Sequence, residues 1–266
     1  MKRSTTCLKR LAMLLAITVL PAFVWGQAYV VVPGGNRVQV EKILVRPDGS
    51  LVVTIGGEPR DIPKDKYVQA VGIKPAGIDQ AQALMNEGKN DEATKVLTKI
   101  LSSSKYQSWD AFAGEKLAVI QLGAGEHLQA KRTLDSLGRR YGDNMISLFP
   151  FLEKVQWDVK VKSSDVVGLE DELTEIIKGQ NEPLRKARAL LVRGDLKASR
   201  KDFQSAVLDY LRVNYFFGDN PELGAEALYK TANAFAKIGD TGRLRKYTTL
   251  LKETYPNSEF SLKIGS

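Results

Sequence analysis

Hydrophobic and polar positions change their period once along the chain. From Ala28 to Pro75, β-branched and apolar residues alternate with polar ones in short runs that end at Gly or Pro, which is typical of half-buried β-strands. From Ile78 onward, apolar residues recur every three or four positions, which predicts amphipathic helices. The pattern therefore predicts a small β module over 28–75, followed by a helical domain over 76–266.

The β module is expected to contain a hairpin. Pro47-Asp48-Gly49 provides the turn residues between Arg37–Arg46 and Leu51–Ile55, because proline presets one backbone angle and glycine tolerates a positive one. The apolar alternation changes phase between Val40 and Ile43, which indicates a bulge or a change of face in the first strand. We expect about four antiparallel strands, arranged as an SH3-like barrel or a small sheet.

The helical part repeats itself. An Ala or Leu stands five residues after Gly88, Gly125 and Gly239, and one further Ala falls in the same register. Small residues at such positions let two antiparallel helices approach closely. The positions are separated by 37, 76 and 38 residues. Because 76 is twice 38, one more unit is expected between the second and third, with its equivalent position near Gly168. These positions are Ala93, Ala130, Ala206 and Leu244.

The last unit carries a recognisable set of residues. A large apolar residue, a small one and an aromatic are followed by a Gly-Asp turn and, after a second helix, a proline. This order resembles the tetratricopeptide repeat. The preceding unit matches at most of the same roles, the first two at fewer, and the middle unit, 148–179, is degenerate. The matching residues are Leu228, Ala232, Phe235, Gly239, Asp240 and Pro256 in the last unit, and Leu190, Gly194, Asp202, Phe203, Ala206 and Tyr210 in the one before.

The resemblance implies an α-solenoid of about five helix hairpins that binds a protein or peptide. In such stacks the first helix of each pair lines a concave groove. Carried onto this sequence, the stripe on the last unit is Glu226, Tyr229, Asn233 and Lys237, and on the unit before it Arg188, Leu191, Asp195 and Ser199. The alternative is that these residues are solvated, or covered by the C-terminal tail, 260–266.

The N-terminus has the features of a signal peptide. Four cations, with no acid among them, precede the apolar run 11–26, which is too short for a comfortable membrane span. Cleavage after Gly26 or after Ala28 fits small-residue selection, and an uncleaved anchor is the alternative. No later stretch of the chain approaches the roughly 20 apolar residues that a membrane-spanning helix requires. We therefore expect a signal peptide over 1–26 and an exported protein, periplasmic if the source has two membranes and otherwise secreted.

Charge and cysteine content argue against a nucleic-acid partner and against cysteine chemistry. The formal net charge is +8, and four of the cations lie in the leader, so the remaining surplus of +4 is weak support for a nucleic-acid partner. Cys7 is the single cysteine and also lies in the leader. A processed chain would therefore have no disulfide, no thiolate metal site and no cysteine nucleophile.

Candidate catalytic residues are few. His127 is the single histidine, which excludes histidine triads and paired-histidine metal sites; we expect it to be solvated at a helix start. Glu170–Glu172 is interpreted as a charge run on a helix surface. The basic pairs Lys131-Arg132 and Arg139-Arg140 are expected to be solvated. No cofactor, metal or catalytic residue is predicted, so the chain is not expected to be an enzyme.

Aromatic residues in the helical part are expected to be core residues because of their helical spacing. They are Tyr210, Tyr215, Phe216, Tyr229, Phe235 and Tyr247.

Two functions remain open. The first is an exported interaction scaffold that binds a peptide segment or an envelope protein in the groove of its repeats. The alternative is a wall polysaccharide-binding protein that uses the β module, with the solenoid as spacer. Carbohydrate sites need exposed aromatic rings, and the module offers Tyr29 and Tyr67, so the first hypothesis is preferred.

Overall fold

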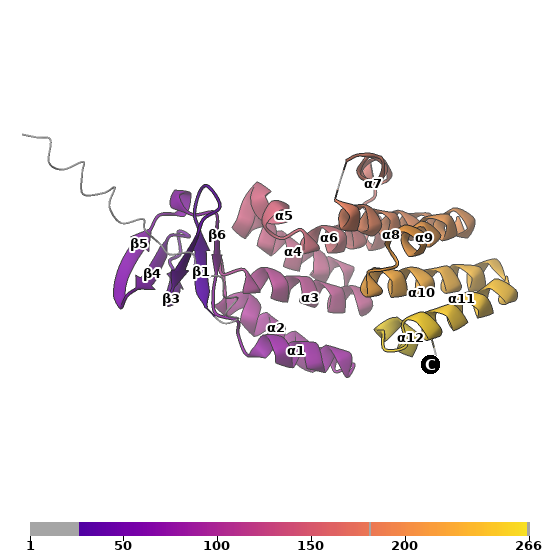
Figure 1. Ribbon diagram of the computed structural model, residues 1–266, viewed down its shortest axis with the longest axis horizontal. Coiled ribbons are helices and arrows are strands. Elements are labelled where there is room, and N and C mark those ends of the chain that lie inside the picture. The colour runs from indigo at the N-terminus through magenta and orange to yellow at the C-terminus, as the bar shows by residue number, and fades with distance from the viewer. Residues whose placement is uncertain (1–26, 181, 265–266) are drawn as a thin grey trace, which may run out of the picture.

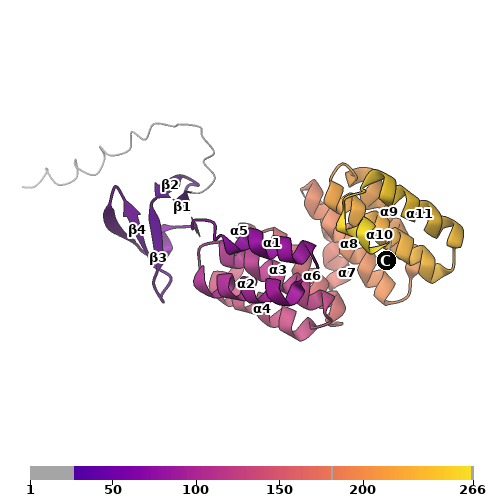
Figure 2. The ribbon, with the colours of Figure 1, turned by 90° about the horizontal axis from the view of Figure 1, so that it is seen from below.

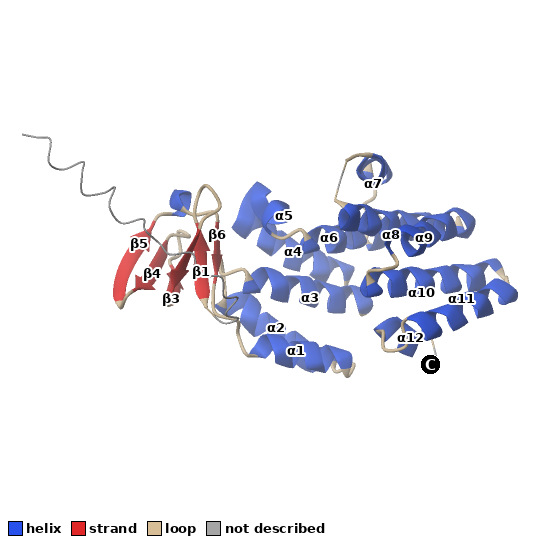
Figure 3. Ribbon diagram, in the orientation of Figure 1, coloured by secondary structure: helices blue, strands red, loops and turns tan. Residues whose placement is uncertain are grey.

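A computed structural model describes residues 27–180 and 182–264. The expected leader, 1–26, with the cleavage alternative after Gly26, therefore lies outside the described residues, whereas Ala28, the other alternative, is the first residue of a described strand. Figure 1 shows a small β module at one end and a long helical region that extends away from it, and Figure 3 shows the strands gathered in the β module, which also holds one short helical turn. The predicted fold class, a tetratricopeptide-like helical repeat region after a small antiparallel β module, is confirmed.

The β module consists of two antiparallel three-stranded sheets, with strand orders β2-β1-β6 and β3-β4-β5. Their inner faces share one core cluster, which includes Val30, Leu51 and Val53. The sheets have more strands than the four expected, because the segments on either side of the hairpin also pair. The strands are β1 (Ala28–Val31), β2 (Arg37–Val40), β3 (Lys42–Val45), β4 (Leu51–Ile55), β5 (Glu58–Ile62) and β6 (Gln69–Val71).

The phase change in the first predicted strand is a change of sheet. β2 pairs with β1, whereas β3 pairs with β4. Between them the Glu41 amide donates to the Thr54 carbonyl at 2.8 Å. The predicted hairpin is thus confirmed for β3, which pairs with β4. The prediction of one continuous strand from Arg37 to Arg46 was wrong. Apolar and polar residues alternate on each side of Glu41, and the phase changes at that residue. Val40 is therefore buried in one sheet and Ile43 in the other.

The module rests on the loop that precedes the third helix. Trp109 Nε1 donates to the Gly72 carbonyl at 2.7 Å, and Ser108 Oγ donates to the Ala70 carbonyl at 2.8 Å. Two non-glycine residues in this loop, Tyr106 and Ser108, have positive φ values of 59° and 67°. Such conformations persist only where the surroundings hold them. The module is therefore attached to the repeats by specific bonds.

The helical region is a series of antiparallel helix pairs that stack side by side (Figures 1 and 2). The first helix of each pair is α1, α3, α6, α8 or α10. The helices are α1 (Gly77–Asn86), α2 (Asn90–Ser103), α3 (Trp109–Gly123), α4 (His127–Tyr141), α5 (Met145–Leu148), α6 (Phe151–Lys162), α7 (Leu169–Lys178), α8 (Pro183–Ser199), α9 (Phe203–Phe217), α10 (Pro221–Ile238), α11 (Thr241–Thr254) and α12 (Glu259–Lys263), with short 3₁₀ turns η1 (Lys64–Lys66) and η2 (Gly142–Asn144).

The residues that defined the repeat lie between paired helices. Ala93, Ala130 and Ala206 are fully buried, as close helix packing requires. At the last turn Gly239 has a φ of 86°, and the Asp240 side chain accepts from the Arg243 amide, so glycine ends one helix and aspartate caps the next.

The middle unit departs from the expected spacing. Gly168 has a φ of 69° and directly precedes α7, so it occupies the turn. In the other units the repeat position is the fourth residue of the second helix, which here is the exposed Glu172. The placement near Gly168 was therefore early by four residues, because the turn after α6 is longer. Trp157 Nε1 donates to Glu172 at 2.8 Å and joins the two helices of this unit instead.

Gly194 is required by the packing of α8 on α9. A Cβ atom added there would overlap the Tyr210 ring. We expect Gly194→Ala to lower the free energy of unfolding by about 1–3 kcal/mol. Gly123→Ala is the matched control, because a Cβ there meets nothing, and should be neutral or stabilise by about 0.5–1 kcal/mol. Denaturant unfolding measures both; equal stabilities would show that the two helices are not in close contact.

Candidate functional site

One cavity of about 760 Å³ is lined by residues from every first helix of the stack. Its lining includes Met85 on α1, Phe112 on α3, Lys154 on α6, Arg188 on α8 and Glu226 on α10, together with residues of α12. Second helices contribute little beyond Asn90 at the start of α2. The first helices therefore share a concave surface, which we call the groove.

A network of ion pairs forms the floor of the groove. Lys154 Nζ lies 3.0 Å from Asp158 and 3.2 Å from Glu226, and Lys230 Nζ lies 3.3 Å from Glu226. Lys230 also pairs with Asp195. These side chains are between 12% and 23% exposed. The network connects α6 to α10, which are distant in sequence.

The network changes the pKa values of its members. Burial raises the pKa of Glu226, but Lys154 and Lys230 outweigh burial and lower it to about 2. Burial lowers the pKa of Lys154, but Asp158 and Glu226 raise it above its ordinary value. At neutral pH both partners are thus charged and bonded to each other. The floor is thus a network in which two lysines and three carboxylates are paired with one another.

Two charged side chains of the groove have no ion-pair partner among the described residues. Arg188 on α8 is half-buried, and Glu222 on α10 is exposed. By contrast, Lys116 is paired with Glu115 at 3.3 Å. A guanidinium without a protein partner can accept a carboxylate in a bidentate pair. Arg188 could therefore pair with a carboxylate of a partner in the groove.

The C-terminal helix α12 forms one wall of the groove. Phe260 packs on Tyr229 with ring centroids 5.5 Å apart, while Glu259, Leu262 and Lys263 line the cavity. The sequence left open the alternative that the C-terminal tail covers the predicted site. Part of that tail lies in α12, which does cover Tyr229.

The predicted stripe on α10 reaches the groove at one end. Glu226 lies in the floor, and Tyr229 lies beneath Phe260. Asn233 and Lys237 are exposed and do not line the cavity. The second half of the stripe lies beyond the part of α10 that lines the groove. The structure therefore does not bring these four residues together at one site.

The stripe on α8 includes one residue that is not available to a partner. Leu191 is fully buried in the main core cluster, so its assignment to the groove surface is corrected. Arg188 lines the cavity. Asp195 accepts from the Tyr210 hydroxyl at 2.8 Å and pairs with Lys230, and Ser199 is exposed with its hydroxyl bonded to the Leu196 carbonyl.

Sequence reasoning missed the contributions of the earlier units. Phe112, Lys116 and Val119 on α3 and Lys154 and Asp158 on α6 line the groove, although those units match the repeat least. The sequence contained a signal that could have identified these residues. Each of these helices is the first of its pair, and the first helix lines the groove in every unit.

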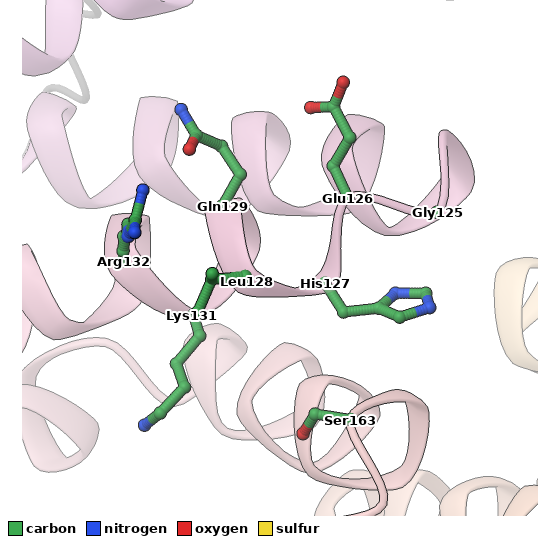
Figure 4. Close-up of a pocket in the computed structure, with 8 residues that line it drawn as sticks. All are labelled: Gly125, Glu126, His127, Leu128, Gln129, Lys131, Arg132 and Ser163. Carbon is green, nitrogen blue, oxygen red and sulfur yellow. The ribbon is translucent and has the colours of Figure 1, made fainter.

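A second cavity of about 670 Å³ surrounds the start of α4 (Figure 4). His127 was expected to be solvated. It begins α4 as predicted, but its Nδ1 atom is buried and has no hydrogen-bond partner among the described residues. Figure 4 shows its ring directed away from Gln129 and Arg132. These side chains diverge, so they form no convergent site.

The other charged candidates have structural roles or are exposed. Arg140 was expected to be solvated, but it is largely buried and pairs with the buried Asp110, so that expectation was wrong. Arg139 and Arg132 are exposed, as expected. In the acidic run, Glu170 pairs with Arg200 at 2.5 Å.

The aromatic expectation was wrong at two positions. Tyr210 and Phe235 are buried, but Tyr215 is 82% exposed and Phe216 is 68% exposed. Neither belongs to the core cluster that Ala206 and Tyr210 form with residues of α8 and α10. Helical spacing alone did not distinguish the two faces.

Within the described residues, no group of three or more histidine, cysteine, aspartate or glutamate side chains is placed to hold a metal ion. The helices in the same part of the chain are all too short or too polar to cross a membrane.

A tetratricopeptide repeat family model matches residues 226–258. The match covers most of α10 and all of α11, the unit in which the repeat residues are most complete. Neither the curated proteins nor the solved structures include a match to the chain. The helical region is thus tetratricopeptide-like, which is consistent with a role in protein–protein interaction.

Proposed function

We propose that this protein is an exported scaffold that binds an extended peptide segment of a protein partner in the groove. The observation that carries the proposal is the shared cavity: five first helices contribute to one concave surface, and the ion pairs of its floor hold α6 against α10. An extended peptide presents polar backbone groups and side chains at intervals, which suits a long surface of mixed polarity. Partners of tetratricopeptide-like stacks are typically proteins.

The polysaccharide alternative has less support. The guanidinium of Arg37 lies 4.9 Å from the Tyr29 ring centroid, and the Tyr67 hydroxyl is bonded to the Gly49 carbonyl at 2.7 Å. Sugars bind through the open face of an aromatic ring. Tyr29 is covered on one face by Arg37, and Tyr67 is half-buried, so the β module is better interpreted as part of the scaffold.

Export remains part of the proposal and rests on the leader. Of the two cleavage positions, the one after Gly26 is favoured, because Ala28 is 2% exposed and pairs with Val40 in β1. Cleavage after Ala28 would remove a core residue of the module.

The proposal is tested by selection of peptides from a random extended-peptide library on the purified full chain. We expect recovered peptides to lose affinity at least about tenfold with Arg188→Glu, because a repulsive charge replaces the free guanidinium. Lys186→Glu, on the same helix but outside the groove, is the control and should bind normally. If both variants bind equally well, or the chain selects no peptide, the groove is not the binding site.

A further inference from the structure

The residue before the first strand has an exposed side chain. Gln27 is exposed and directly precedes β1, whose first residue, Ala28, is 2% exposed and pairs with Val40 of β2. β1 is the central strand of its sheet and pairs with β6 on its other side. Gln27 is therefore the single residue between the expected leader and the sheet.

The strand register places Gln27 opposite Glu41. Ala28 pairs with Val40, and in an antiparallel pair the preceding position on one strand meets the following position on the other. Gln27 and Glu41 also line the same cavity, of about 310 Å³. The Glu41 carboxylate accepts from the Gly57 amide at 3.2 and 3.3 Å. The exposed side chain of Gln27 lies beside this open space, so it is free to change its conformation.

Cleavage after Gly26 turns Gln27 into the N-terminal residue. This is the cleavage position that the proposed function favours, and the inference rests on it. The new α-amino group then belongs to the same residue as the side-chain carboxamide, and a five-membered ring results when its nitrogen bonds to the carboxamide carbon, Cδ. An α-amino group has an ordinary pKa of about 7.7–8.0, so a fraction of it is neutral and nucleophilic at neutral pH. Both reacting groups are thus present on one exposed residue.

We propose that Gln27 of the processed chain cyclises to pyroglutamate. The amine nitrogen attacks Cδ of its own side chain, and the bond between Cδ and the amide nitrogen breaks. That nitrogen leaves as ammonia, with the proton that the amine gives up. The reaction consumes no oxidant, reductant or other co-reactant. Its product is a neutral lactam opposite Glu41, in place of a charged N-terminus.

The lactam protects the central strand of the sheet. Aminopeptidases require a free α-amino group, which the lactam lacks. In a chain with a free N-terminus, the removal of Gln27 would expose Ala28, a member of the core cluster of the β module. Because β1 pairs with both β2 and β6, trimming at this end would weaken the pairing on both sides.

The test is the intact mass of the chain purified from its source, measured when fresh and again after prolonged incubation at neutral pH. We expect the mass of residues 27–266 less that of one ammonia, with the loss located in the N-terminal peptide by fragmentation. The α-amino group should not react with an amine reagent, and the chain should resist an aminopeptidase. Gln27→Asn is the matched control, because it keeps the carboxamide but would have to form a strained four-membered ring. This variant should keep its full mass, react with the reagent and be trimmed.

The outcomes separate this inference from the proposed function. A chain that starts at Gln27 and keeps a free α-amino group at both times refutes cyclisation and leaves export and the groove intact. The same loss of ammonia in Gln27→Asn also refutes it. A chain that starts at Tyr29 refutes both cyclisation and the favoured cleavage position, and an unprocessed chain refutes export as well. Peptide binding is tested separately by Arg188→Glu.

Discussion

Replacing Asp209 by alanine is expected to lower the free energy of unfolding by about 3–5 kcal/mol. Asp209 is fully buried and pairs with Arg193 and Lys197, each at 2.7 Å, and with Arg212 at 3.2 Å. Without the carboxylate, the largely buried Arg193 would have no compensating charge. Denaturant unfolding at pH 7 measures the loss, with Asp171→Ala, at an exposed position of α7, as control.

The loss of stability in Asp209→Ala should depend on pH. Burial raises the pKa of Asp209, but its bonds to Arg193 and Lys197 outweigh burial, and the net shift is downward. A carboxyl whose folded-state pKa is lowered stabilises the protein above its unfolded-state pKa, about 3.9, and loses this contribution as the pH falls through the folded-state value. The difference between wild type and Asp209→Ala should thus be constant above about pH 5 and shrink at lower pH. A difference that grows on acidification would contradict the pairing.

Replacing Asp110 by alanine should have a comparable effect at the other end of the stack, about 3–5 kcal/mol. Asp110 is fully buried and accepts from the Tyr141 hydroxyl at 2.6 Å and the Tyr106 amide at 3.2 Å, and it pairs with Arg140. The Tyr106 amide belongs to the loop that holds the β module. Its release should therefore loosen the module as well as destabilise the helices.

Hydrogen exchange measures this second effect. In Asp110→Ala we expect faster amide exchange in residues 105–109, in β6 and in Gly72, which directly follows β6 and donates to the Gln107 carbonyl at 3.2 Å. Asp143→Ala, an exposed aspartate after α4, is the control and should exchange normally. Global destabilisation with unchanged local exchange in β6 would show that the module is held independently of Asp110.

The sequence predicted the architecture well because its signals are local. The Gly239-Asp240 turn and the small residues at Ala93 and Ala130 follow directly from how two helices must approach and reverse. The sheet change at Glu41 was visible as a change of phase. What the pattern could not show was which strand each half pairs with, because that choice depends on contacts between distant segments.

The candidate site was harder to predict for the same reason. Arg188 lines the groove, whereas Leu191, predicted on the same stripe, belongs to the core. A helix that packs on both neighbours has a narrow free face, and one residue of rotation moves a side chain from surface to core. The covering of Tyr229 by Phe260 and the pairing of Lys154 with Glu226 depend on the full stack.

Photo-crosslinking in the living source cell shows directly whether a partner binds in the groove. A photoreactive amino acid is placed at Gln82 or at Glu222, exposed residues that line the groove on α1 and α10. Leu128 on α4 and Leu208 on α9 are exposed positions outside it. We expect both groove positions to crosslink to the same segment of one protein, and the two outer positions to form no crosslink to it. Crosslinks to that protein from Leu128 and Leu208, with none from Gln82 and Glu222, would contradict it.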